Sequence, residues 1–265
     1  SLREQFQRLT PVVPSFRDFF PLLEEGNLST FYRSFLSLPK DTVGFWIQTC
    51  KSYLLQRVSA FSPEDRWFCR LAERYPEDPG CFAPYYLNLV EISPGEGLFL
   101  EAGVLHAYLQ GFGVELMANS DNVLRGGLTS KHMDVEELLK VVRFEPTTPT
   151  VIRPIRKRIK TRAGECWEEQ YPVPVMEFSL SVLRTDGVGD DIPLPISGPE
   201  ILLCGEGVWE VRRESASEGI SLKRGEACFL DATVPEVFLS SRAPDSGSKN
   251  SSHAAIFRVR VGVNG

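Results

Sequence analysis

Two segments of this 265-residue chain repeat each other at an offset of 130 residues, and this repeat limits the possible folds more than any other feature. They are PGEGLFLEAGVLHAYL, from Pro94, and RGEACFLDATVPEVFL, from Arg224. Each reads as a hairpin with a glycine turn, a strand, a small-residue corner and a second strand. A duplicated small β-barrel is the simplest explanation. Chance similarity is the alternative, because strand composition is restricted.

Helical patterns precede the first repeat. Between residues 16 and 75, apolar residues recur three and four apart, which predicts about four amphipathic helices. One start is strongly marked in SPEDRWFCRLAERY: Ser62 can cap the helix, Pro63 suits its first position and Asp65 completes a capping box. Another helix is expected in MDVEELLKVVRF, after Lys131, with acidic residues in its first turn and basic residues in its last.

Short apolar runs separated by glycine and proline predict strands after residue 80. The runs are YYLNLVEI, GLFLEAG, HAYLQG and VELMA, and then VMEFSLSVL, EILLCGEG, GVWEVRR, ACFLDA, EVFLSS and AAIFRVRVGV. FEPTTPTV and the basic RPIRKRIKTR (153–162) read as linkers between the two sets. We therefore expect a mainly β protein with a helical segment, in which antiparallel β-sandwich domains follow a helical one. The expected parts are a helical domain at 1–80, a central β portion with one helix at 81–150, and a carboxyl-terminal β domain at 151–265.

Charge and cysteine usage exclude several classes of protein. The formal net charge of −6 provides no general field for nucleic acid or an anionic membrane. The chain shows no apolar run of signal-peptide or transmembrane length, and its six cysteines are scattered without C-x-x-C pairs. We expect a soluble, cytoplasmic protein with reduced thiols, without nucleic-acid or membrane partners, and monomeric.

His106 is the first candidate for chemistry. It lies where a strand is expected to resume after a corner, so its imidazole could point into a barrel, where it would suit zinc, iron or manganese. A lone histidine more often packs or hydrogen-bonds. The second repeat, however, carries Glu236 at the matching position, so the fold itself does not require histidine there.

One histidine does not make a metal site, because zinc needs about four ligands, or three and an open position. His132, at a helix entrance, and His253, in a polar loop, read as solvated residues. Glu101 and Glu115 are nearer to His106 in sequence and are candidate ligands or acid–base groups.

The densest polar segment, VELMANSDNVLRGGLTSKHMD, joins Glu115, Asn122, Arg125 and Lys131. An arginine fork and a mobile lysine charge could together bind a phosphate. The alternative is a polar loop rich in turn-forming residues.

PGEGLFLEAGVLHAYLQG followed by VELMANSDNVLRGGLTSKHMDVEELL resembles the central signature of type I mannose-6-phosphate isomerases, in the cupin superfamily. The resemblance implies a bicupin of jelly-roll barrels with an inserted helical domain. It also implies that His106 is a zinc ligand, that Arg125 is catalytic, that Glu115 faces the substrate cavity, and that Lys131 and Asn122 contact the substrate or its phosphate.

The implied activity is the aldose–ketose isomerisation of mannose 6-phosphate and fructose 6-phosphate through a cis-enediol, with one Zn²⁺ and a hexose 6-phosphate as the small-molecule partner. One departure matters: family members supply further zinc ligands through a Gln-x-His pair and a glutamate in an amino-terminal region, and Gln48 here is followed by Thr49 and Cys50. The resemblance thus implies a fragment of the enzyme, a region supplied elsewhere, or a divergent copy. The alternative functions are a non-catalytic sugar-phosphate-binding or regulatory cupin and an interaction scaffold.

Overall fold

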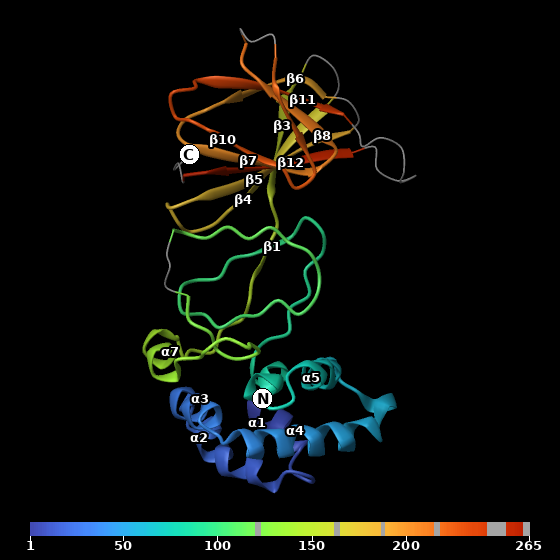
Figure 1. Ribbon diagram of the computed structural model, residues 1–265, viewed down its shortest axis with the longest axis vertical. Helices are drawn as coiled ribbons and strands as arrows, with labels where there is room; N and C mark the ends of the chain where they lie inside the picture. Colours follow the sequence, from blue (N-terminus) through green and yellow to red (C-terminus); the bar gives the residue numbers. More distant parts are fainter. Residues whose placement is uncertain (120–122, 162–164, 187–188, 215–217, 243–252, 262–265) are drawn as a thin grey trace. The chain divides into compact units, whose positions relative to one another are not determined.

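The computed structural model describes residues 1–119, 123–161, 165–186, 189–214, 218–242 and 253–261, and Figure 1 labels most of their α-helices and strands. The chain divides into two compact units. The first unit comprises Ser1–Glu91, Leu100–Gly113 and Asp121–Thr150; the second comprises Ile92–Phe99, Val114–Ser120 and Val151–Gly265. The three-part division expected from the sequence stays a prediction.

The first unit is helical. Its α-helices are α1 (Leu2–Gln7), α2 (Phe20–Glu24), α3 (Leu28–Leu36), α4 (Lys40–Leu55), α5 (Pro63–Arg74), α6 (Ala83–Tyr86) and α7 (Val135–Val141). Its 3₁₀ helices are η1 (Pro14–Phe19), η2 (Val58–Ala60) and η3 (Pro79–Phe82). The predicted helical region is confirmed, with more and shorter segments than expected. None of these described helices is long and apolar enough to cross a membrane.

Helix α5 begins where the sequence predicted. The Ser62 hydroxyl accepts a hydrogen bond from the Asp65 amide at 3.2 Å, and the Asp65 carboxylate accepts one from the Ser62 amide at 2.9 Å. This reciprocal pair satisfies two amides that the first turn leaves without partners. Helix α7 is also confirmed: Asp134 is its N-cap, Glu136 and Glu137 lie in its first turn, and Lys140 lies in its last.

Aromatic rings fill the core of the first unit. Phe35 is fully buried and has ring contacts with Phe6, Phe31 and Phe82 at centroid distances of 5.5–6.0 Å. Because each such ring buries a large apolar area, replacing one by alanine typically costs about 3–5 kcal/mol. The helices are short, so this shared core stabilises them more than their own propensity does.

The second unit is an antiparallel β-sandwich. One sheet has the order β10-β7-β12-β5-β4-β3 and the other has the order β6-β11-β8-β9. Side chains from both sheets, including Leu183, Leu202, Trp209 and Leu239, form one buried core between them. The mainly antiparallel β architecture with a helical part is the predicted fold class.

Among the described residues, ten strands form the two sheets. They are β3 (Ile155–Lys160), β4 (Glu165–Tyr171), β5 (Ser179–Asp186), β6 (Gly189–Pro195), β7 (Glu200–Glu206), β8 (Val208–Arg212), β9 (Ile220–Lys223), β10 (Ala227–Leu230), β11 (Glu236–Arg242) and β12 (His253–Arg260). All six strand-like runs predicted after residue 170 are confirmed. His253 opens β12, so its assignment to a polar loop was wrong.

The basic linker predicted at 153–162 is wrong, because most of it is the edge strand β3. Its partner β4 is acidic, and their register sets Arg156 opposite Glu169. These two side chains are 3.5 Å apart, and Arg158 reaches Glu165 at 2.5 Å. Opposite charges on paired strands stabilise this register, and the cations on the outer edge disfavour further strand addition.

The strands predicted between residues 85 and 119 are mostly wrong. Only Gly97–Leu98 (β1) forms a ladder, with Val151–Ile152 (β2), and no other strand occurs among the described residues of 85–150. The start of YYLNLVEI lies in α6. A strand requires a hydrogen-bonded neighbour, and Leu105, the residue just before HAYLQG, packs instead against the helical core.

The internal repeat is confirmed at the local level. Gly95 and Gly225 have φ of +88° and +85°, conformations that favour glycine. The amides of Glu96 and Glu226 each donate to the carbonyl three residues earlier, at 3.0 and 2.8 Å. The Glu96 carboxylate accepts a hydrogen bond from the Ser93 amide at 2.9 Å, and the Glu226 carboxylate accepts one from the Lys223 amide at 2.8 Å. The two turns thus share one geometry.

The hairpin predicted for the second repeat is wrong. Strand β10 pairs with β7 in one sheet, and β11 pairs with β6 and β8 in the other. The corner between them, where the Val234 amide donates to Asp231 at 3.0 Å, therefore carries the chain across the sandwich. The first repeat has the matching bond from Val104 to Glu101, at 3.3 Å.

Candidate functional site

His106 is exposed and its ring orientation is fixed by its own segment. Its Nδ1 lies 2.9 Å from the carbonyl oxygen of Val104. Because a carbonyl oxygen can only accept, Nδ1 donates in this contact, and the neutral ring then has its lone pair on Nε2. The ring also meets Tyr108 edge-on, at a centroid distance of 5.9 Å. A metal-binding histidine commonly has this arrangement, in which one nitrogen donates to a carbonyl and the other is available.

The His106 segment is attached to the first unit through the residues that precede it. Leu105 packs against the aromatic core, whereas His106 is exposed. Upstream, the Arg143 amide donates to the Gly103 carbonyl at 3.0 Å, and the Arg143 guanidinium pairs with Glu101. Glu101 was a candidate metal ligand, but its carboxylate is used in this ion pair.

Arg125 is also exposed and follows Leu124, which packs against the same core. The next residue, Gly126, accepts a hydrogen bond from the Tyr32 hydroxyl at 3.0 Å. A methyl group added at Gly126 would lie only 3.1 Å from Cδ2 of Leu105. The residues adjoining Arg125 and His106 are therefore in contact, so the structure brings these two predicted site segments together.

The turn after Arg125 is held in an uncommon conformation. Gly127 and Leu128 have φ of +127° and +53°, and the second value is costly for a side chain with a Cβ. A methyl group added at Gly127 would lie 3.1 Å from the Asp78 carboxylate and 3.3 Å from Cα of Gly80. Burial of the Leu128 side chain against the core offsets the strain and fixes the turn against η3.

The remaining predicted residues are less closely tied to this pair. Lys131 is exposed, and its amide donates to the Thr129 hydroxyl at 3.1 Å. Glu115 is exposed and belongs to the second unit. Asn122 lies outside the described residues. His132 is exposed, as expected of a solvated residue.

The metal-binding residues expected of a zinc centre are incomplete in the described part of the chain. There, no three His, Cys, Asp or Glu side chains gather in a way that could hold a metal ion. His106 fits zinc as a single ligand, since its tautomer leaves Nε2 available. A complete zinc site would need further donors.

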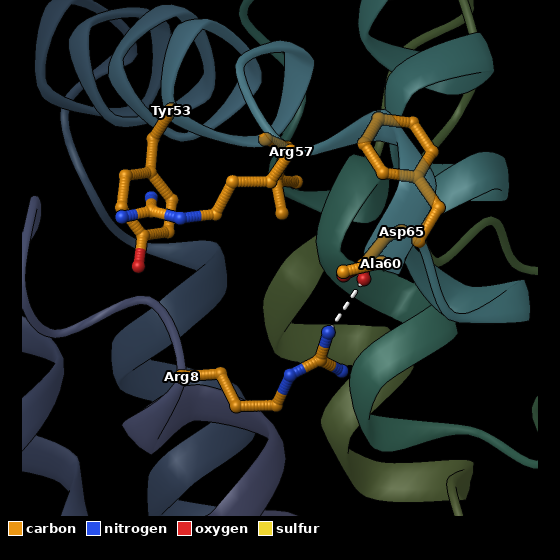
Figure 2. Close-up of a pocket in the computed structure, with 7 residues that line it drawn as sticks. Arg8, Tyr53, Arg57, Ala60 and Asp65 are labelled. Atoms are coloured by element: carbon orange, nitrogen blue, oxygen red, sulfur yellow. Dashed lines mark hydrogen bonds and ion pairs between the residues drawn. The ribbon is translucent and has the colours of Figure 1, made fainter.

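A hollow of about 280 Å³ in the first unit contains none of the candidate residues. Arg8, Tyr53, Arg57 and Asp65 line it, with Arg8 directed at Asp65 in Figure 2. Arg8 and Asp65 are 2.5 Å apart, and Asp65 also accepts a hydrogen bond from the Tyr85 hydroxyl at 3.0 Å. The polar groups of this hollow thus serve the packing of α1, α5 and α6.

Sequence reasoning missed Tyr32 and Leu105. Tyr32 lies in α3, 94 residues before Gly126, and α3 reads as an ordinary amphipathic helix. Only the hydroxyl on an otherwise apolar face distinguishes it from a core phenylalanine.

Comparisons with known proteins support the resemblance stated from the sequence. No protein-family model matches the chain. The mannose-6-phosphate isomerase of Salmonella typhimurium is 39% identical over 166 residues, which cover 61% of this chain and 39% of the relative. That of Macaca fascicularis is 38% identical over 238 residues, which cover 80% of this chain and 55% of the relative. The chain thus spans roughly two fifths to just over half of the length of these curated relatives.

Solved structures give the same result for the fold. A crystal structure of mannose 6-phosphate isomerase from Salmonella typhimurium, bound to the substrate F6P and zinc, matches with a TM-score of 0.75 and 29% identity. The match covers 99% of this chain and 61% of that one. Similarity in sequence and in fold therefore leads to the same kind of protein.

Proposed function

We propose that this chain, which shares sequence and fold with mannose-6-phosphate isomerases over part of their length, serves in the interconversion of mannose 6-phosphate and fructose 6-phosphate. The observation that carries the proposal is the contact between the His106 and Arg125 segments through Leu105 and Gly126. It joins a histidine in a metal-binding tautomer to an exposed arginine, within a sequence similar to that of a protein solved with F6P and zinc.

The reaction moves a proton from C2 of the aldose to C1, while a hydroxyl proton passes from O2 to O1. As the C–H bond at C2 breaks, negative charge develops on the carbonyl oxygen at C1, and protonation of that oxygen gives the neutral cis-enediol. In the proposal, the Arg125 guanidinium stabilises that oxygen and Glu115 relays the carbon-bound proton. Lys131, with Asn122, binds the anionic end of the substrate, because a lysine charge on a flexible stem can follow a phosphate.

Zinc belongs to the proposal as a bound cofactor that would supply Lewis acidity to the sugar oxygens. His106 would hold it through Nε2, while Nδ1 donates to the Val104 carbonyl and orients the ring. Further ligands would come from outside the described residues.

We also propose that the chain binds a hexose 6-phosphate, that it is monomeric and that it is located in the cytoplasm. We keep the division into a helical domain at 1–80, a central site-bearing portion at 81–150 and a carboxyl-terminal cupin-like domain at 151–265. The second candidate function, a cupin that binds phosphosugars without turnover, is favoured by the incomplete ligand set among the described residues.

One experiment separates the two functions. The 265-residue chain would be purified without chelators, its zinc content measured by elemental analysis, and its production of fructose 6-phosphate followed in a coupled assay. Turnover that is lost in Arg125→Ala supports the isomerase, and turnover near wild type in that variant removes the role of Arg125. Fructose 6-phosphate binding without zinc or turnover, measured by calorimetry, supports the binding protein.

A further inference from the structure

A buried side chain of the helical core forms a hydrogen bond to the backbone next to Arg125. Tyr32 is 4% exposed, and its hydroxyl donates to the Gly126 carbonyl at 3.0 Å. Its ring packs against Tyr86 and Phe144, at centroid distances of 6.0 Å in each case. The hydroxyl is therefore held by a rigid aromatic cluster and not by a mobile chain end.

Gly126 is the point where three segments meet. A methyl group there would lie 2.9 Å from the Tyr32 hydroxyl oxygen and 3.1 Å from Leu105 Cδ2. Leu105 directly precedes His106, and Gly126 directly follows Arg125. A displacement of Gly126 would thus alter the position of Arg125 relative to the histidine segment.

From this geometry we infer that Tyr32 is a positioning residue: by fixing the Gly126 carbonyl, it sets the distance between Arg125 and His106. The inference rests on the proposed function for its catalytic consequence, but not for the anchoring itself. The hydroxyl remains a donor throughout the physiological range, because burial, and secondarily the Asp78 carboxylate, raise the pKa of Tyr32 above its usual value.

The strained turn at Gly127 and Leu128 makes the hydrogen bond from Tyr32 to Gly126 more important. Leu128 has a φ of +53°, so the backbone after Gly126 is strained and must be held by its surroundings. The contact of Leu128 with Gly80 holds one end of this short turn, and the hydrogen bond from Tyr32 to Gly126 holds the other. Loss of the hydroxyl should therefore loosen residues 124–130 and, through Leu105, residues 104–106.

The test compares Tyr32→Phe with a matched control, Tyr85→Phe. Tyr85 is a second buried tyrosine of the same core, and its hydroxyl donates to Asp65 at 3.0 Å. Both variants lose one buried hydroxyl, but only the first loses a bond to a site segment. Amide hydrogen exchange of the full 265-residue chain, followed by mass spectrometry, would report on residues 104–106 and 124–130.

We expect exchange in both segments to rise about fivefold in Tyr32→Phe, the change that loss of one ordinary hydrogen bond produces, and to stay at the wild-type rate in Tyr85→Phe. Where the chain turns over mannose 6-phosphate, kcat should fall about tenfold or more in Tyr32→Phe with KM within about twofold, since a displaced arginine loses transition-state contacts. Unchanged exchange in Tyr32→Phe overturns the anchoring, and increased exchange with unchanged kcat overturns the positioning role. If the wild-type chain shows no turnover, the proposed function fails while the exchange data still decide the anchoring.

Discussion

Arg258 and Glu200 form a two-pronged ion pair inside the second unit: Nε donates to Oε2 at 2.6 Å and Nη2 to Oε1 at 2.8 Å. Both residues are at least 96% buried, and Nη2 also donates to the Pro195 carbonyl at 2.6 Å. Strand β12 is thereby fixed to β7 and to the end of β6 by charge-assisted bonds that water does not screen.

Replacing Arg258 by methionine should lower the free energy of unfolding by about 3–5 kcal/mol, because it leaves Glu200 charged, buried and unpaired. Urea denaturation followed by tryptophan fluorescence would measure this. The matched control is the double variant Arg258→Met with Glu200→Met, which should recover most of the loss. Equal losses in the single and double variants would mean that packing, and not the unpaired charge, causes the effect.

Gly127→Ala should destabilise the turn beside Arg125. The backbone φ of +127° is rarely adopted with a Cβ, and the added methyl would meet the Asp78 carboxylate at 3.1 Å. We expect a loss of about 1–3 kcal/mol in unfolding free energy, measured by thermal or urea unfolding. Gly111→Ala is a useful comparison: its φ is also positive, at +120°, but nothing lies within 4 Å of the added methyl. A similar loss at both sites would assign the effect to backbone strain alone.

Buried thiols should make stability fall at alkaline pH. Burial raises the pKa of Cys50, Cys81 and Cys166 to about 12, against 9.0 for an exposed thiol. Because the folded pKa is the higher one, the unfolded chain loses these protons first. The contribution of these protonated thiols to the free energy of unfolding is therefore fully present below pH 9 and is lost as the pH rises toward 12. Urea midpoints measured between pH 8 and 10.5 should decline, and less steeply in Cys166→Ala; an unchanged slope in that variant would contradict the assignment.

Two arginines of the charged edge strand β3 should each stabilise the fold modestly, and by different amounts. Arg158 pairs with Glu165 on the surface, whereas Arg156 pairs with Glu169 and also lies 4.4 Å from the centre of the Trp167 ring. Arg158→Ala should lower the free energy of unfolding, measured by urea denaturation, by less than about 1 kcal/mol. About 1 M NaCl should remove most of that loss. Arg156→Ala should still lower the free energy of unfolding in high salt, because salt screens stacking on an aromatic ring less than it screens a surface ion pair. Identical salt responses would exclude that stacking contribution.

Local signals in the sequence were sufficient for several elements. The Ser62, Pro63 and Asp65 pattern predicts the start of α5, because a capping box depends on residues three apart. The repeated glycine and glutamate of the two turns predict matching geometry, because both bonds close within a few residues. Arg125 and His106 could be selected from motif resemblance, although that alone did not show that their segments touch.

The sequence by itself determined the features that depend on neighbours along the chain: helix starts, glycine turns, and the short apolar runs that form strands such as β7 and β11. Only the tertiary structure decided the rest. The basic run at 155–160 is a strand because β4 supplies an acidic partner, whereas the run around Leu105 is not a strand because its leucine packs into the helical core. The bond from Tyr32 to Gly126 joins residues 94 positions apart. Contacts of that range depend on how the whole unit packs, and no local pattern of residues encodes them.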